Sequence, residues 1–148
     1  MTQEDKELLL KDICARLPYG VKAYVKNWSK LDGKYYEDIY DVKSVFPSLN
    51  EVHVQSKTGS VDVILGYYDY DIKPYLFPLS SMTEEQKQEY AYIVNYISSD
   101  DTENWKEGEF IYVEQFSQLM HFYIINHLDY RGLIPMGLAN DATGLNIY

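Results

Sequence analysis

The first apolar pattern in the chain predicts an N-terminal helix from about Thr2 to Arg16. Apolar side chains recur there at intervals of three and four residues, which is the spacing of one helix face; they are Leu9, Leu10, Ile13, Cys14 and Leu17. Thr2 is a suitable N-cap, and Pro18 with Gly20 is expected to end the helix. Because Cys14 falls on the apolar face, we expect it to be a small core residue.

Alternation of apolar and polar residues then predicts four strands. They cover Gly20 to Trp28, Tyr35 to Val45, Glu51 to Ser56 and Ser60 to Tyr68. Asp32-Gly33 is expected at the tip of the first turn, Lys57-Thr58-Gly59 connects the third and fourth strands, and Gly66 marks a bulge or bend. Turns this short favour antiparallel pairing, because parallel strands need long crossovers.

The second half of the chain predicts two helices. Asp71 to Leu79 contains two prolines and is typical of an extended connector with at most one short edge strand. Ser81 or Thr83 can form a capping box for a helix whose apolar stripe is Tyr90, Ile93, Val94 and Ile97. Ser98 to Gly108 is polar and is expected to be an exposed loop. The last helix, Val113 to Leu128, is apolar on most sides, so we expect it to be well buried and to end at Arg131-Gly132.

These elements predict one α+β domain over residues 1–148. The expected architecture is an N-terminal helix, then a four- to five-stranded antiparallel curved sheet or small open barrel, and two C-terminal helices packed on it.

The net charge of the chain limits the classes of molecule that it can bind. The formal net charge is −10, so the chain repels nucleic-acid phosphates, and its lysines at 22, 26, 30 and 34 are spread along an edge rather than gathered in a patch. Direct nucleic-acid binding is therefore not expected. An acidic chain can instead bind a basic protein or imitate DNA as an inhibitor.

Cysteine use and hydropathy indicate a cytoplasmic protein. Cys14 is the single cysteine, which excludes an intramolecular disulfide. The polar N-terminus does not resemble a secretion signal, and no apolar run is long enough to span a membrane. We expect no membrane association.

No motif in the chain predicts catalysis, a metal or a cofactor. His121 and His127 lie six residues apart, on different faces of a helix, and His53 is far away in sequence. Paired carboxylates are plentiful, and we interpret them as a solvated acidic rim rather than as a catalytic pair. A small hydrolase-like enzyme that uses Cys14 or a carboxylate pair stays an alternative hypothesis.

Tyrosine is the unusual feature of the composition, with 16 residues. Tyrosine suits half-buried surfaces and interfaces because it joins an apolar ring to one hydroxyl. The leading hypothesis is therefore a non-enzymatic protein that binds another protein. Its predicted contact residues are Tyr67, Tyr68, Asp69, Tyr70, Asp71 and Tyr75. Arg131, one of two arginines, is predicted to anchor an anion or to clamp a carboxylate.

Three segments of the chain, taken together, resemble segments of a known protein family. They are Cys14 to Val21 (CARLPYGV), Lys73 to Glu85 (KPYLFPLSSMTEE), and Asp129 to Ile134 (DYRGLI) followed by Gly137-Leu138-Ala139. In this order the set resembles a family of small uncharacterised proteins of gut Bacteroides genomes, mobile elements and phages. The resemblance implies a bacterial, cytoplasmic, phage-linked setting. It implies no activity and no functional residues.

Overall fold

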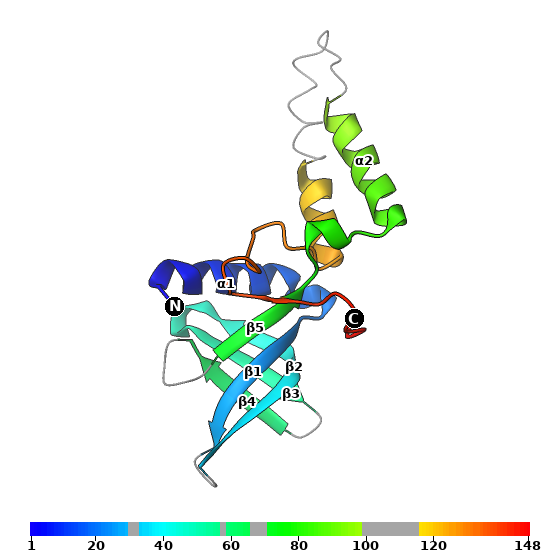
Figure 1. Cartoon of the computed structure of the whole chain (residues 1–148). Helices are drawn as coiled ribbons and strands as arrows, with labels where there is room; N and C mark the ends of the chain where they lie inside the picture. The colour runs from blue at the N-terminus through cyan, green and yellow to red at the C-terminus, as the bar shows by residue number, and fades with distance from the viewer. Residues whose placement is uncertain (30–32, 57–58, 66–70, 99–115) are drawn as a thin grey trace.

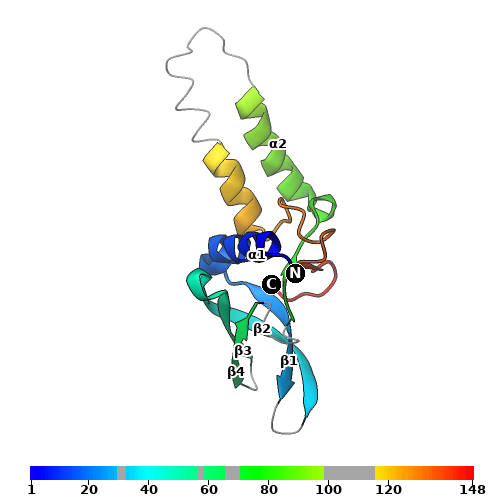
Figure 2. The same ribbon diagram turned by 90° about the vertical axis from the view of Figure 1, so that its left-hand side faces the viewer.

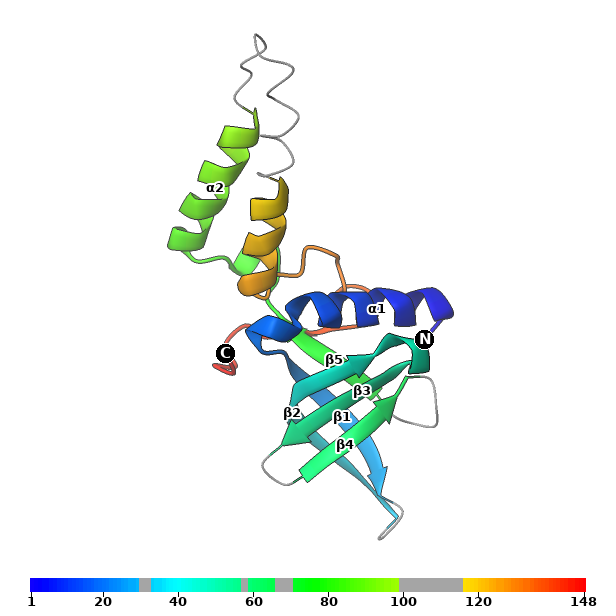
Figure 3. The same ribbon diagram turned by 180° about the vertical axis from the view of Figure 1, so that it is seen from behind.

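The computed structural model describes residues 1–29, 33–56, 59–65, 71–98 and 116–148, and these form an α+β fold (Figure 1). A helix near the N-terminus lies against a curved sheet, and two later helices extend away from the sheet (Figures 1 and 3). The predicted tip at Asp32, the connection at Lys57-Thr58, the bend at Gly66 and most of the predicted loop Ser98 to Gly108 lie outside the described residues.

The N-terminal helix α1 (Gln3–Arg16) begins as its capping pattern predicts. Thr2 Oγ1 accepts a hydrogen bond from the Asp5 backbone N–H (3.1 Å), and the Asp5 carboxylate accepts one from the Thr2 backbone N–H (2.7 Å). Leu9, Leu10 and Ile13 are buried as expected. Cys14 is exposed, so the prediction that it is a core residue is wrong. Asp12 and Arg16 occupy buried positions beside the leucines instead.

The sheet has six strands, in the order β4-β3-β2-β1-β5-β6. β1 to β4 form the predicted antiparallel meander, β5 pairs antiparallel with β1, and β6 pairs parallel with β5. The strands are β1 (Lys22–Ser29), β2 (Lys34–Phe46), β3 (Glu51–Ser56), β4 (Gly59–Ile64), β5 (Asp71–Leu76) and β6 (Asn140–Asp141). Four of the six strands therefore follow the predicted pattern, while the expected total of four or five and the all-antiparallel pairing are corrected.

Segment 71–79 is the main correction within the sheet. The short edge strand expected within this connector is present as β5, but it lies between β1 and β6 rather than at the edge of the sheet. Pro74 is tolerated there because β6 pairs only with Tyr75 and Leu76, so β5 is an edge strand on that side at the proline. A register shift falls between Val42 and Ser44 of β2, a bulge that the sequence pattern did not predict.

The main core lies on the concave face of the sheet. One cluster of buried side chains draws on α1 and on each of β1 to β5, including Ile13, Val25, Val54, Val63 and Ile72. The cluster spans five neighbouring strands, from β4 to β5, and includes the buried face of α1. The convex face carries the alternate, mostly polar residues of the same strands.

The two later helices are α2 (Glu84–Ser98) and a helix over residues 116–125. Thr83 and Gln86 form the predicted capping box, each accepting from the backbone N–H of the other (3.2 and 2.9 Å). The second helix ends before the predicted Leu128, because His127 adopts a positive φ of 52° and Leu128 bridges to Phe77. It is also less buried than predicted: Phe122 is 1% exposed, but Phe116 is 63% exposed.

Tyr148, the last residue, links the segment after β6 to the sheet. Tyr148 donates its hydroxyl hydrogen to the Tyr75 carbonyl (2.7 Å) and accepts a hydrogen bond from the Lys22 backbone N–H (3.2 Å). Its ring stacks on His127, with 3.9 Å between ring centroids. Among the described helices, none has the length and apolar character needed to cross a membrane.

Candidate functional site

Of the predicted contact residues, the structure describes Asp71, Tyr75 and Arg131. Asp71, at the start of β5, forms an ion pair with Lys73 (3.7 Å). Tyr75 is 9% exposed and has little surface to offer a partner. Arg131 lies against α1. Tyr67, Tyr68, Asp69 and Tyr70 lie outside the described residues.

Arg131 takes part in a buried ionic centre that joins three segments of the chain. Asp12 and Arg16 of α1 are both 0% exposed, and Arg16 Nε donates to Asp12 Oδ2 at 2.8 Å. Arg16 also donates to the backbone carbonyls of Tyr123 (3.2 Å) and Leu128 (2.8 Å). Arg131 Nε donates to Asp12 Oδ1 at 3.2 Å. Of the roles considered for Arg131, the structure shows a clamp on the carboxylate of Asp12, and the centre ties α1 to the chain around residues 123–131.

Aromatic rings surround this centre. The guanidinium groups of Arg16 and Arg131 lie 5.4 and 4.7 Å from the ring centroid of Tyr130, and Tyr123 stacks on the same ring at 5.4 Å. Burial lowers the pKa of nearby His127 to about 4, and the charge of Arg16 acts in the same direction. This cluster has few exposed atoms, so we assign it to stability rather than to binding.

Asp12 is a residue that sequence reasoning missed, although a signal was present. Leu9, Asp12, Ile13 and Arg16 follow the spacing i, i+3, i+4, i+7 of a buried helix face. Two opposite charges at i and i+4 on such a face indicate a buried ion pair rather than a surface one.

Cys14 has the wrong electrostatics for a nucleophile. It is exposed, and desolvation raises the pKa of its thiol, so the thiol is protonated at neutral pH. Nucleophilic cysteines instead have a lowered pKa.

We predict that Cys14 in the native protein reacts completely with a colorimetric thiol reagent at neutral pH, because it is accessible. The reaction should be slower than that of a small free thiol, because less thiolate is present. A thiol that reacts only after denaturation would contradict the exposed position. A rate above that of the free thiol would revive the hydrolase hypothesis.

Two carboxylates on the convex face, those of Glu37 and Asp41, form ion pairs with neighbouring lysines. Lys26 lies 3.9 Å from Glu37, and both Lys22 and Lys43 contact Asp41. The hydrogen bond from Lys22 holds the pKa of Asp41 below its ordinary value. A general acid needs the opposite shift, so the surroundings of Asp41 do not suit acid catalysis. His53 on β3 forms a close pair with Asp62 on β4. Among the residues that the structure describes, His, Cys, Asp and Glu form no group suited to a metal ion.

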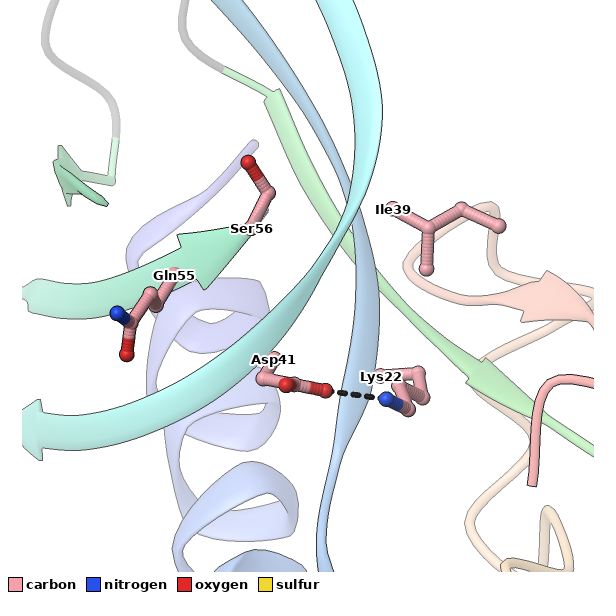
Figure 4. A pocket seen from close by; sticks show the side chains of 5 residues that line it. All are labelled: Lys22, Ile39, Asp41, Gln55 and Ser56. Atoms are coloured by element: carbon pink, nitrogen blue, oxygen red, sulfur yellow. Dashed lines mark hydrogen bonds and ion pairs between the residues drawn. The ribbon is translucent and has the colours of Figure 1, made fainter. Parts of the chain in front are cut away.

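An open groove of about 240 Å³ crosses the convex face (Figure 4). Strand register places Lys22 opposite Asp41 and Asp41 opposite Gln55, so these three side chains form one row across β1, β2 and β3. Ile39 and Ser56 complete the lining. The groove offers an ion pair, an amide and one apolar side chain, which suits contacts with polar groups rather than covalent chemistry.

The two later helices form a second candidate surface, which we call the helical arm (α2 and residues 116–125). It extends from the sheet in each of three views (Figures 1, 2 and 3). Ile93 of α2 packs with Phe122 and Leu128 in a small cluster of its own, and Gln86 donates to the Asn126 side chain at 3.0 Å. The two helices of the arm therefore pack against each other, and the arm projects from the sheet.

One exposed face of α2 combines acidic and aromatic side chains. Glu85, Glu89 and Tyr92 follow each other at helical spacing on α2 and are exposed, Tyr92 to 71%. Phe116 on the other helix is 63% exposed. Large exposed aromatic residues with polar neighbours are typical of protein contact surfaces.

No family model, curated protein or solved structure matches the chain. Function therefore has to be inferred from the geometry of the described residues. That geometry offers two accessible surfaces, the groove and the helical arm, and one buried structural centre.

Proposed function

We propose that the chain is a non-enzymatic protein-binding module whose helical arm binds a basic protein. The observation that carries the proposal is the exposed acidic and aromatic face of an arm that extends from the sheet. An enzyme needs catalytic groups held around a cleft, whereas the ion pairs described on the sheet and in the buried centre occupy their charged groups with one another.

The sequence between the two helices of the arm supports a basic partner. Residues 99–115 contain six acidic residues and one lysine. α2 contains three more acidic residues, Glu84, Glu85 and Glu89, and one lysine, Lys87. Much of the net charge of −10 therefore falls in and between the two helices. Such a concentration of charge attracts basic partners over distances of about a Debye length, roughly 8 Å at physiological salt.

The aromatic side chains supply the contact area that charge alone lacks. Tyr92 and Phe116 are large enough to anchor an interface once a partner removes them from water. We expect the acidic residues to set the rate and salt dependence of binding, and the aromatic residues to set the lifetime of the complex.

The test is affinity capture from a lysate of a gut Bacteroides, the setting that the resemblance implies, followed by mass spectrometry. Wild-type protein should retain a basic protein at low salt and lose most of it at high salt. The variant Glu85→Lys/Glu89→Lys should lose at least tenfold of the captured partner.

A matched control separates the arm from net charge. Glu4→Lys/Glu7→Lys changes the net charge by the same amount on exposed positions of α1. We expect this variant to capture the partner at near wild-type levels. Equal losses in both variants would show a non-specific charge effect and would contradict the proposal.

Two other outcomes would redirect the assignment. Capture of a DNA-binding protein that duplex DNA displaces would favour the DNA-mimic hypothesis, in which the acidic residues imitate phosphates. Loss of the partner after Ile39→Glu, but not after the arm substitutions, would move the binding surface to the groove.

A further inference from the structure

The ring of Tyr148 rests on two aromatic residues at the base of the helical arm. It stacks on the imidazole of His127, with 3.9 Å between centroids and 16° between planes, and its centroid lies 5.9 Å from that of Phe77. The Phe77 N–H donates to the His127 carbonyl (2.9 Å), and His127 is 6% exposed. These two residues are therefore held by the folded body and not by the segment that carries Tyr148.

The hydroxyl group of Tyr148 bridges two strands of the sheet. Lys22 of β1 and Tyr75 of β5 come directly after the last positions at which these two strands are paired. The hydroxyl accepts from the Lys22 N–H (3.2 Å) and donates to the Tyr75 carbonyl (2.7 Å). Burial raises the pKa of Tyr148 to about 12, so the hydroxyl keeps its proton at neutral pH. We call His127, Phe77 and the two backbone groups the tyrosine site.

The contacts of the tyrosine site select one kind of side chain. His127 and Phe77 accept any flat ring. The adjacent N–H and C=O groups need one atom that both accepts and donates a hydrogen bond, and a phenol hydroxyl is such a group. Phenylalanine has no polar atom to offer, and tryptophan only donates. The site is therefore specific for tyrosine.

The segment that carries Tyr148 has few other attachments. Among the described residues, the hydrogen bonds of residues 143–147 are local, one to the Asp141 carboxylate (2.8 Å) and one to the Ala142 carbonyl (3.1 Å). Most of these residues are exposed, and Tyr148 itself is 41% exposed. The ring can therefore leave the site without unfolding a helix or a strand.

We propose that the tyrosine site binds a tyrosine side chain of a partner protein, and that Tyr148 occupies it as an internal competitor. A tyrosine of the partner makes the same stacking contacts and the same two hydrogen bonds once Tyr148 has left. Because the partner binds only the chains in which the site is empty, Tyr148 lowers its apparent affinity. The site is separate from the exposed face of α2 and does not depend on the role proposed for that face.

An NMR titration that follows the Lys22 amide tests the proposal, with N-acetyl-tyrosinamide as the probe. Tyr148→Ala empties the site, so the probe should shift this amide saturably and bind about tenfold more tightly than it binds the wild type. N-acetyl-phenylalaninamide should bind the same variant about tenfold more weakly than the tyrosine probe, because it leaves both backbone groups unpaired. As a control, Tyr92→Ala removes an exposed tyrosine of α2 and should behave as the wild type.

Tyr148→Phe keeps the test decisive if Tyr148→Ala does not fold. This variant retains the ring and loses only the hydroxyl, so it competes less well for the site. The tyrosine probe should bind it more tightly than the wild type and more tightly than the phenylalanine probe does. Equal affinities of the probe for the wild type and Tyr148→Phe, equal binding of the two probes, or an unshifted Lys22 amide in both variants would overturn the proposal.

Discussion

Replacing Arg16 with methionine is expected to lower the free energy of unfolding by about 3–5 kcal/mol. The substitution leaves the buried Asp12 carboxylate without its closest partner. It also removes the two hydrogen bonds that Arg16 donates to backbone carbonyls, one in helix 116–125 and one just after it. An unpaired buried charge is among the single changes that lower the free energy of unfolding most. Urea denaturation followed by circular dichroism measures the change.

Two companion variants show that the effect comes from the ion pair. Arg131→Met removes a partly exposed partner and leaves the contact between Asp12 and Arg16 intact, so it should cost about 1 kcal/mol. The double variant Asp12→Leu/Arg16→Met should lose less stability than the sum of the losses in Asp12→Leu and Arg16→Met, because neither member of the buried pair is left without the other. The partly exposed Arg131 loses a partner in both variants that remove Asp12. A loss below 1 kcal/mol for Arg16→Met would show that the centre does not hold these segments together.

Lowering the pH from about 6.5 to about 4 is expected to cost about 3 kcal/mol of stability through His127 alone. Burial lowers the pKa of this imidazole from 6.5 to about 4 in the folded protein. Between these pH values the unfolded chain binds the proton and the folded chain does not, so unfolding becomes easier as the pH falls. Above pH 6.5 both states are neutral and the contribution is fully present.

His127→Asn separates this titration from that of the carboxylates. Asparagine tolerates the positive φ of 52° at this position and does not titrate. The variant should lose most of the slope between pH 6.5 and 4, measured as urea midpoints across the pH range. The loss of stability linked to the lowered pKa of Asp41 falls at lower pH and should persist. An unchanged slope in the variant would contradict the assignment to His127.

Local patterns predicted much of the fold because local chemistry determines those elements. The Thr2 capping box, the alternation in β1 to β3 and the Thr83 capping box depend on residues within a few positions of each other. β5 was expected only as a short edge strand within a connector, because its two partners come from opposite ends of the chain and it contains a proline. Pairing between strands that are far apart in the sequence produces no regular spacing of apolar residues that could predict it.

The candidate surfaces were less predictable than the fold. The groove exists because strand register aligns Lys22, Asp41 and Gln55, and no local spacing encodes that alignment. Burial of the helix over residues 116–125 was overestimated because its apolar residues were assumed to face the sheet. They belong to an arm that packs through Phe122 and leaves Phe116 exposed.

Hydrogen exchange of the chain, alone and bound to the captured partner, tests the central claim most directly. If the helical arm is the binding surface, protection on binding should concentrate in residues 84–98 and 116–125, and the backbone of β1 to β3 should exchange as it does in the free chain. Protection of the sheet with no change in these two helices would contradict the account and would assign the partner to the convex face.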